Sequence, residues 1–441
     1  MMVSSILTSD LAAQEWGLDD FAFSALSSTV FAGLLVGNLL GGFLADSLGR
    51  RTTMIGVNVV FCVFGVLSAI APDIWVFAIS RFFTGIGVGS MVPVSDTHLL
   101  EWSPRDWRGK LAMLLTGVAF AIGAAFACIA GIEVSTYGGE EWWRWMLLVC
   151  IIPGLVALPF FILYLPESPH WLLVHDRVEE CEEKLRELAE ANGVEVLAGG
   201  KVAKIERKVE QEGWDPLEIL GPELRATTLY CTIAWVVCGF VYYGHIFMYP
   251  VLLEDVYDLK ITEAYSTILI GTLGEVCVVV SMMFIMDIEG IGRRGAMAIG
   301  FAITWLCAAF APLAQDLTQF IILNSLIKGL IEGPFTVIYI YAGELFPSTH
   351  RGIAVSFCNS FGRIAAMIAP ITLMSCYHVS PFTVFLALSS MAFVGLAATF
   401  FFYRETLGRD LIMFASDIKS EEELPLIPLL KPSKRRDAAA K

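Results

Sequence analysis

A series of eleven long apolar windows constrains this chain more than any other feature of its sequence. Each window is long enough to cross about 30 Å of hydrocarbon as a helix. Charged residues make up 17% of the chain, whereas they make up about a quarter of a soluble domain. We therefore expect an all-α membrane protein with complete spans over residues 21–45, 52–70, 74–98, 110–132, 144–165, 226–250, 263–287, 295–313, 319–343, 352–376 and 381–403.

The Lys and Arg residues indicate which way the spans run. If the pair at 50–51 is cytoplasmic, all 29 basic residues fall on that side except Arg81, Arg144, Lys260, Lys328 and Arg363. This positive-inside pattern predicts a cytoplasmic C-terminus. We expect the protein to lie in the plasma membrane or in the membrane of an intracellular vesicle. The net charge of −15 therefore gives no indication of a nucleic-acid partner.

Two motifs recur at the same offset. Gly-Arg-Arg occurs at 49–51 and again at 292–294, which is 243 residues later, and at this offset Asp46 corresponds to Glu289. The pattern E-x-x-P-x-x-x-R-G occurs at 101–109 and, at the same offset, at 344–352. A shared offset indicates two homologous halves of six helices. The first nine residues are apolar but too short to span, so we interpret them as the end of a truncated opening helix.

These features predict four regions. Residues 1–165 form an N-terminal helical half with a truncated opening helix, and residues 223–405 form a C-terminal half of six helices. Between them, residues 166–222 form a cytoplasmic linker, in which 177–193 has the pattern of an amphipathic helix stopped by Asn192-Gly193. Residues 406–441 form a charged, Pro-containing cytoplasmic tail of disordered composition.

The motifs resemble the major facilitator superfamily. Its loop signature G-x-x-x-D-x-x-G-R-R stands at 42–51, and the sugar-porter and organic-ion branches add the two E-x-x-P-x-x-x-R-G loops, P-E-S-P at 166–169 and E-T-x-G at 405–408. Within the superfamily, the chain resembles the branch of the synaptic vesicle glycoproteins and their SVOP-type relatives, on the stretches MMVSSIL at 1–7, Tyr-Tyr-Gly at 242–244 and GRIAAMIAP at 362–370 and on the acidic residue Glu275. The resemblance implies two pseudo-symmetric six-helix halves around a central cavity, with helices three, six, nine and twelve on the outside. Asp96 and His98 depart from it, because the branch usually has uncharged residues there.

The resemblance also implies a cytoplasmic gate. Asp46 would accept hydrogen bonds from the helix that opens at Arg351, while Gly41 and Gly42 would let their helix approach a neighbour closely. The charges would hold the two halves together and break when the inside opens; the alternative is ordinary positive-inside loop charge. The gate residues are Asp46, Arg50, Arg51, Glu101, Arg108, Glu167, Glu289, Arg293, Arg294, Glu344, Arg351 and Glu405.

Charged side chains within spans are costly and mark candidate functional sites. Lys328 and Glu332 are four residues apart, so they share a helix face and are able to neutralise each other. Glu275 has no partner in its own helix and is either a proton-coupling site or the structural partner of a cation. Tyr242, Tyr243 and Tyr339 either offer ring faces on which a substrate stacks or pack in the core. His245 is interpreted as a packing residue. The predicted substrate and proton pathway comprises Arg81, Tyr242, Tyr243, Glu275, Lys328, Glu332, Tyr339 and Arg363.

These observations predict a secondary transporter of a small organic ion that works by alternating access, with or without proton coupling. The alternative is a transporter-like binding or sensor protein that no longer moves substrate. The sequence contains no H-E-x-x-H, G-x-S-x-G or phosphate-loop motif, so we expect no enzyme. We expect no cofactor or metal, and a monomer whose partners are the organic ion, H⁺ and membrane lipid.

Overall fold

The computed structural model describes residues 16–17, 20–103, 111, 114–193, 216–347, 351–402 and 404–407. Eleven helices in this part of the chain are long and apolar enough to span a membrane, as predicted. The N-terminal half contains α3 (Asp20–Leu48), α4 (Arg50–Ala69), α5 (Ile74–Trp102), the π-helical turn η2 (Leu114–Val118), α7 (Ala119–Tyr137) and α8 (Trp142–Leu163). The predicted remnant of an opening helix, residues 1–9, lies outside the described residues.

The C-terminal half repeats this order of helices. It contains α11 (Arg225–Tyr257), α12 (Ile261–Ile285), α13 (Gly292–Phe310), α14 (Leu317–Leu345), α15 (Arg351–Val379) and α16 (Pro381–Phe401). The bounds of α5 and α14 differ by the predicted offset, and Asp73 and Asp316 cap their N-termini by accepting backbone hydrogen bonds. The repeat seen in two loop motifs therefore extends to whole helices.

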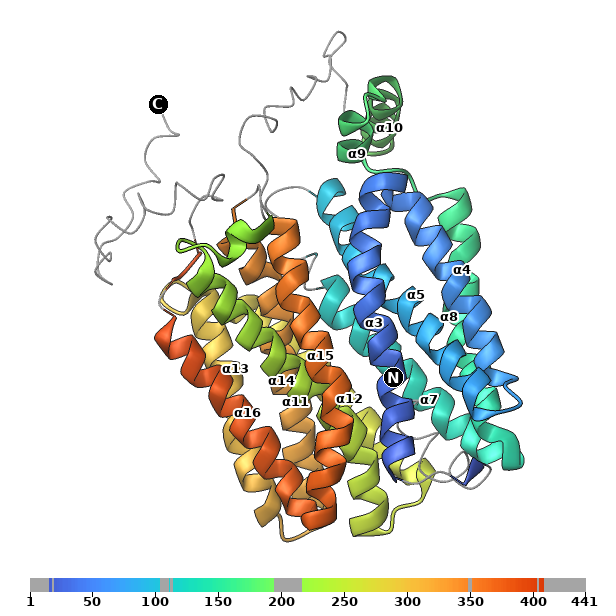
Figure 1. Cartoon of the computed structure of the whole chain (residues 1–441), viewed down its shortest axis with the longest axis vertical. Coiled ribbons are helices and arrows are strands. Elements are labelled where there is room, and N and C mark those ends of the chain that lie inside the picture. Colours follow the sequence, from blue (N-terminus) through green and yellow to red (C-terminus); the bar gives the residue numbers. More distant parts are fainter. Residues whose placement is uncertain are drawn as a thin grey trace.

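The halves stand side by side, the first in blue to teal and the second in green to red (Figure 1). The peripheral helices α4, α8, α13 and α16 make their main contacts within their own half, which agrees with the outer positions that the resemblance implies for them. The halves meet chiefly through α3 against α15 and α7 against α12. In Figure 1 their ribbons lie apart at the end that carries the linker helices and come together toward the opposite end.

Side chains at the interface confirm where the halves touch. The Ser28 hydroxyl donates to the Met367 carbonyl at 2.8 Å, and a Cβ on Gly131 would lie 2.4 Å from the Tyr265 ring. Tyr265 is one turn from the start of α12, at the predicted outer end of the molecule. α7 therefore packs directly against α12 on that side, because residue 131 has no side chain.

Close helix packing was correctly predicted for one glycine of the 41–42 pair. A Cβ on Gly41 would lie 2.7 Å from the Ser90 Cα, so α3 and α5 are in backbone contact there. A Cβ on Gly42 would meet nothing within 4 Å, and the prediction for this residue is wrong. The two residues point in different directions because adjacent positions on a helix lie about 100° apart.

The linker begins with a helical hairpin of α9 (Pro169–Val174) and α10 (Val178–Ala191). Cys181 is fully buried between the two helices, and this burial raises the pKa of its thiol. The Trp171 indole donates to the Asp46 carbonyl at 2.9 Å, which ties the hairpin to the end of α3. Asn192 and Gly193 end α10 as predicted; residues 194–215 lie outside the described part of the linker.

Candidate functional site

The first charged network lies at the predicted cytoplasmic end of the N-terminal half. Arg50 is buried, and its guanidinium lies 3.0 Å from Glu101 and 3.2 Å from Asp46. It also donates to the Ala45 carbonyl at 3.1 Å. One arginine thus joins the ends of α3, α4 and α5.

An equivalent network lies in the C-terminal half. Arg293 lies 3.1 Å from Glu344 and 3.1 Å from Asp287, and it donates to the Met286 carbonyl. The predicted counterpart of Asp46 was Glu289, but the structure gives that role to Asp287, and Glu289 is exposed. The reason is that α12 ends at Ile285, so residue 289 falls in a turn that has no equivalent after α3.

Each Gly-Arg-Arg motif also receives a carboxylate from further along the chain. Glu167 accepts from the backbone N–H groups of Arg50 and Arg51, and Glu405 accepts from those of Arg293 and Arg294. A negative charge at these positions stabilises the N-termini of α4 and α13.

The glycine of each motif makes room for that carboxylate. Gly49 and Gly292 have positive φ angles of 95° and 64°, which other residues rarely adopt. A Cβ on either would lie 2.3 Å from the carboxyl group of Glu167 or Glu405. Glycine is therefore required at each position for two reasons: its backbone has a positive φ, and the carboxylate occupies the space that a side chain would need.

Among the described residues, these charges do not join the two halves in this structure. Every ion pair described among them links helices of one half, and none crosses to the other. The two halves lie apart at this end (Figure 1), which leaves each network to brace its own half. Arg108 lies outside the described residues, and Arg351 is described only as the first residue of α15.

The second candidate site lies deep within the C-terminal half. Glu275 of α12 is fully buried and lies 2.9 Å from the ammonium group of Lys328 on α14. It also accepts a hydrogen bond from Tyr242 of α11 at 2.8 Å, while Lys328 donates to Thr272 at 2.6 Å. Of the two roles considered for Glu275, the structure supports the partner of a buried cation.

Glu332 therefore does not share an ion pair with Lys328, although the two are one helical turn apart. One oxygen of its carboxylate lies 3.4 Å from the Thr336 hydroxyl, and the other has no hydrogen-bond partner. The side chain is buried. It is a carboxylate that none of its described neighbours neutralises through direct contact.

Arg363 of α15 is buried and faces two tyrosines instead of a carboxylate. Its guanidinium donates to Tyr243 at 2.7 Å and to Tyr339 at 3.3 Å. Its Nε–H has no partner, and neither hydroxyl has an acceptor for its own proton among the described contacts. One N–H and two O–H groups around this guanidinium are therefore available to a ligand.

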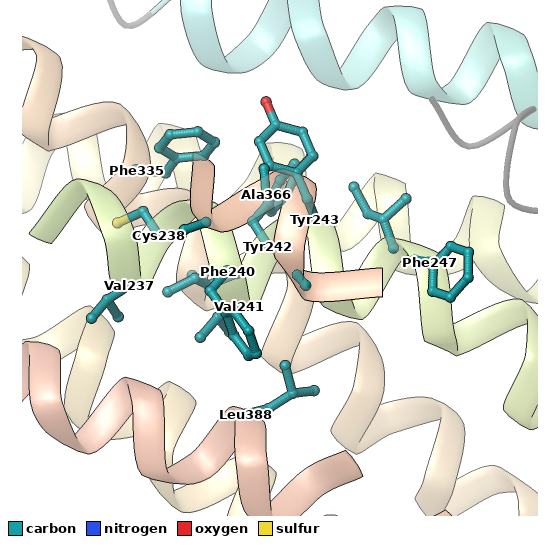
Figure 2. Close-up of a cluster of buried hydrophobic side chains, with 14 of the residues drawn as sticks. Val237, Cys238, Phe240, Val241, Tyr242, Tyr243, Phe247, Phe335, Ala366 and Leu388 are labelled. Atoms are coloured by element: carbon teal, nitrogen blue, oxygen red, sulfur yellow. The ribbon is translucent and has the colours of Figure 1, made fainter. Parts of the chain in front are cut away.

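Aromatic rings lie among these polar residues. Phe335 of α14 contacts Tyr242 and Tyr243 with ring centroids 5.6 and 5.9 Å apart. Figure 2 shows these three residues on the side of α11 toward the ribbon of the N-terminal half, with Val241 and Leu388 on the other side. From that half, Phe31 reaches Tyr243 at 5.1 Å, so the tyrosines lie at the interface between the halves.

Arg81, which was predicted to lie in the pathway, and His245, which was predicted to pack, lie apart from these groups. Arg81 is buried in α5 and interacts electrostatically with Cys150 of α8, within its own half. His245 lies 3.1 Å from Asn324 and stacks on Tyr249, which agrees with the interpretation of packing.

Three residues that make polar contacts in the membrane-spanning region were not identified from the sequence. Thr272 was missed because a threonine within a span usually bonds its own helix, which it also does here. Asn38 and Asn359 approach each other at 3.4 Å across the two halves. A polar residue in each of two apolar windows was the only available signal for that contact.

Comparisons with known proteins agree with this architecture. The sequence model of the family described as "Sugar (and other) transporter" matches residues 6–417. The chain is 28% identical to the synaptic vesicle 2-related protein of Xenopus laevis over 431 residues, covering 93% of this chain and 76% of that protein. It is 32% identical to the solute carrier family 22 member 15-like protein of Xenopus tropicalis over 384 residues, covering 84% and 75%.

Solved structures establish the fold. The proton:xylose symporter XylE bound to 6-bromo-6-deoxy-D-glucose matches with a TM-score of 0.73 at 18% identity, covering 95% of both chains. A partially occluded inward open conformation of the xylose transporter XylE from E. coli matches with a TM-score of 0.69 at 19% identity, covering 93% of this chain and 94% of that chain.

Proposed function

The chain belongs to the Sugar (and other) transporter family of the major facilitator superfamily, and from this premise we propose that it moves a small organic ion across its membrane by alternating access. The halves would rock about the central residues of α11, α12, α14 and α15. In this proposal the linker hairpin and the C-terminus are cytoplasmic, so the end where the ribbons lie apart faces the cytoplasm.

The observation that carries the proposal is the set of unused donors at Arg363. A buried guanidinium without a carboxylate partner is costly, and an anionic ligand would compensate its charge while accepting from Nε and both tyrosine hydroxyls. We therefore propose that the substrate carries an anionic group, which binds between Tyr243 and Tyr339.

The remainder of the site supports an organic rather than an inorganic anion. The rings of Tyr242, Tyr243 and Phe335 offer apolar surface. The free carboxylate oxygen of Glu332 offers an acceptor for a hydroxyl or amino group of the same substrate. Residues 332 and 339 are separated by about 10 Å along α14, which suits a molecule with polar groups at both ends.

Uptake into proteoliposomes tests this function. The panel is aromatic carboxylates, quaternary amines, sugars and phosphate, each with and without an inward proton gradient. We expect gradient-driven uptake of a carboxylate, and loss of at least about 90% of it in Arg363→Lys, because lysine cannot reproduce the guanidinium fork. The Glu275→Gln variant distinguishes the two roles considered for Glu275. If Glu275 is the structural partner of Lys328, the variant should impair gradient-driven transport and exchange transport equally.

Arg177→Lys is the matched control, since Arg177 is exposed on the linker hairpin and should leave uptake unchanged. Uptake of quaternary amines alone would overturn the anionic substrate. Binding without uptake for every compound would overturn the transporter and favour the sensor.

A further inference from the structure

Four charged side chains are buried in the described part of the C-terminal half. Two are cations, Lys328 and Arg363, and two are carboxylates, Glu275 and Glu332, and each has at most 5% of its surface exposed. When all four are ionised their charges sum to zero. A balanced set of this kind costs less in an apolar interior than a set with an excess charge.

The two carboxylates differ in how well they are held. Glu275 lies 2.9 Å from the ammonium group of Lys328 and accepts a hydrogen bond from Tyr242 at 2.8 Å. Glu332 has only the Thr336 hydroxyl, 3.4 Å from its Oε1 atom, and its Oε2 atom has no partner. Of the two, Glu332 is therefore the carboxylate that exchanges its charge without breaking an ion pair.

Printed contacts connect the helix face of Glu332 to the anion site. Glu332 and Tyr339 lie two turns apart on one face of α14, about 10 Å along the helix. Phe335 lies between them, and its ring contacts that of Tyr243 at 5.9 Å on the same side of α11 (Figure 2). Tyr243 and Tyr339 both accept hydrogen bonds from Arg363. The free carboxylate and the free guanidinium thus belong to one layer of the C-terminal half.

Glu332 also lies close to the boundary between the two halves. A Cβ on Gly117 would lie 3.4 Å from the hydroxyl of Thr336, which is the hydrogen-bond partner of Glu332. Gly117 belongs to η2, the π-helical turn of the N-terminal half, and such turns often occur at functional sites. Glu332 is therefore one helical turn from the interface, where separation of the halves would give it access to water.

The elements packed against α14 bring few other charges to this position. Among the described residues, α13 carries charged side chains only at its start, Arg293 and Arg294, while η2 and η6 (Ala311–Leu313) carry none. On α15 the buried charge is Arg363. The titratable groups that interact electrostatically with Glu332 are Cys238, Tyr242, Tyr243, Glu275, Lys328 and Tyr339.

We propose that Glu332 is the residue that exchanges a proton with water when this transporter binds its anion. An anion at Arg363 cancels the charge that balances Glu332, and the site is left with one excess negative charge. Glu332 then takes up one proton from water on its free oxygen, Oε2, and the charges again sum to zero. Because the proton leaves when the anion leaves, one proton crosses the membrane with each anion.

This inference rests on the proposed function, because it requires an anion at Arg363. It assigns the coupling to a carboxylate other than Glu275, which Lys328 already neutralises. A hydroxyl group at the far end of the substrate remains a suitable partner for Glu332 in both states, since a hydroxyl donates to the ionised acid and accepts from the protonated one.

Calorimetric titration of the purified full-length protein with benzenesulfonate tests the coupling. This probe stays anionic around neutral pH, so any pH dependence belongs to the protein. Repeating the titration in two buffers of different ionisation enthalpy gives the number of protons taken up per anion bound. For the wild type we expect close to one proton near neutral pH, and up to about a tenfold gain in affinity for each pH unit lowered.

The Glu332→Gln variant keeps the shape of the side chain and removes the titratable group. It should bind benzenesulfonate without proton uptake, and at neutral pH as tightly as the wild type does in acid, because no carboxylate charge opposes the anion. In proteoliposomes it should retain anion exchange and lose stimulation by an inward proton gradient. The Glu332→Asp variant keeps an acid and should restore proton uptake with a shifted pH midpoint. Glu183→Gln, at an exposed carboxylate of α10, is the matched control and should behave as the wild type does.

Several results would overturn the role of Glu332 and leave the anion site standing. They are unchanged proton uptake in Glu332→Gln, anion binding to the wild type without proton uptake, and loss of binding in both variants, since this side chain is not proposed to contact the sulfonate. If Glu332→Gln does not fold, a pH midpoint in Glu332→Asp identical to that of the wild type would overturn the role. Failure of the wild type to bind benzenesulfonate, together with no carboxylate uptake in the liposome panel, would overturn both this inference and the proposed function.

Discussion

The two halves of the molecule are nearly identical at one end and differ in the middle. At the predicted cytoplasmic end, Arg50 and Arg293 have the same kinds of partner. Each lies against a glutamate near the end of the next helix, an aspartate that precedes the Gly-Arg-Arg motif and a backbone carbonyl. In the middle, the positions that correspond to Glu275, Lys328, Glu332 and Arg363 are Ala32, Gly85, Gly89 and Phe120.

The two equivalent helix pairs therefore pack in different ways. In the N-terminal half, Gly85 and Gly89 bring α5 into backbone contact with Val30 and Leu34 of α3. In the C-terminal half, the same positions carry Lys328 and Glu332, so that side chains separate α14 from α12. The first pair is built for rigid packing and the second for binding charge.

The largest effect is expected where the buried charges are unbalanced. Lys328→Ala would leave Glu275 buried without its cation and should destabilise the protein by about 3–5 kcal/mol. The measurement is the unfolding midpoint of purified protein in detergent. Lys328→Met combined with Glu275→Leu should recover most of the loss, because it removes both charges together. If the double variant is as unstable as the single one, the ion pair is not the cause.

The converse change tests close packing in the N-terminal half. A Cβ on Gly89 would lie 2.3 Å from the Leu34 carbonyl, so Gly89→Ala should cost up to about 3 kcal/mol by forcing α3 and α5 apart. At Gly329 in the other half the nearest atom would be 3.2 Å away, on the Val278 side chain, so the overlap is much smaller and Gly329→Ala should cost less. Equal losses of stability would remove the contrast between the two helix pairs.

The glycines of the duplicated motif should respond alike in both halves. Gly49→Ala and Gly292→Ala each impose strain from a positive φ and a clash with a carboxylate, for a cost of about 1–3 kcal/mol. Gly42→Ala is the matched control, since its Cβ would meet nothing within 4 Å, and it should be neutral or slightly stabilising. Thermal unfolding of the three variants side by side gives the ranking.

The smallest effect is expected from the carboxylates that cap α4 and α13. Glu167→Gln and Glu405→Gln keep the side-chain shape but remove the charge at the helix N-terminus, which should cost about 0.3–1 kcal/mol in each half. Glu289→Gln should change nothing, because Glu289 is exposed in the turn before α13. A larger loss for Glu289→Gln than for Glu405→Gln would restore the pairing suggested by the sequence repeat.

The sequence predicted what depends on periodicity and repetition. Hydropathy located the spans, and the repeat placed Glu101 and Glu344 at equivalent positions, which the structure confirms by pairing both with the motif arginines. It did not predict which carboxylate would neutralise Lys328. Glu332 is the neighbour along the helix, but Glu275 on α12 is the partner, because the choice depends on how two helices pack.

Sequence also could not settle whether the charged loops join the halves or brace them. The choice depends on the conformation of the protein, and in this structure the described residues brace each half separately. Asp287 was missed for a simpler reason, since a longer turn after α12 shifts the position that faces Arg293 by two residues.

The bond from the Trp171 indole to the end of α3 has a practical consequence. Because this bond ties the hairpin of α9 and α10 to the N-terminal half, the far end of α10 should be displaced when that half tilts. A fluorescent dye at exposed Glu187, paired with an acceptor in the bilayer, would report any such tilt as a change in energy transfer.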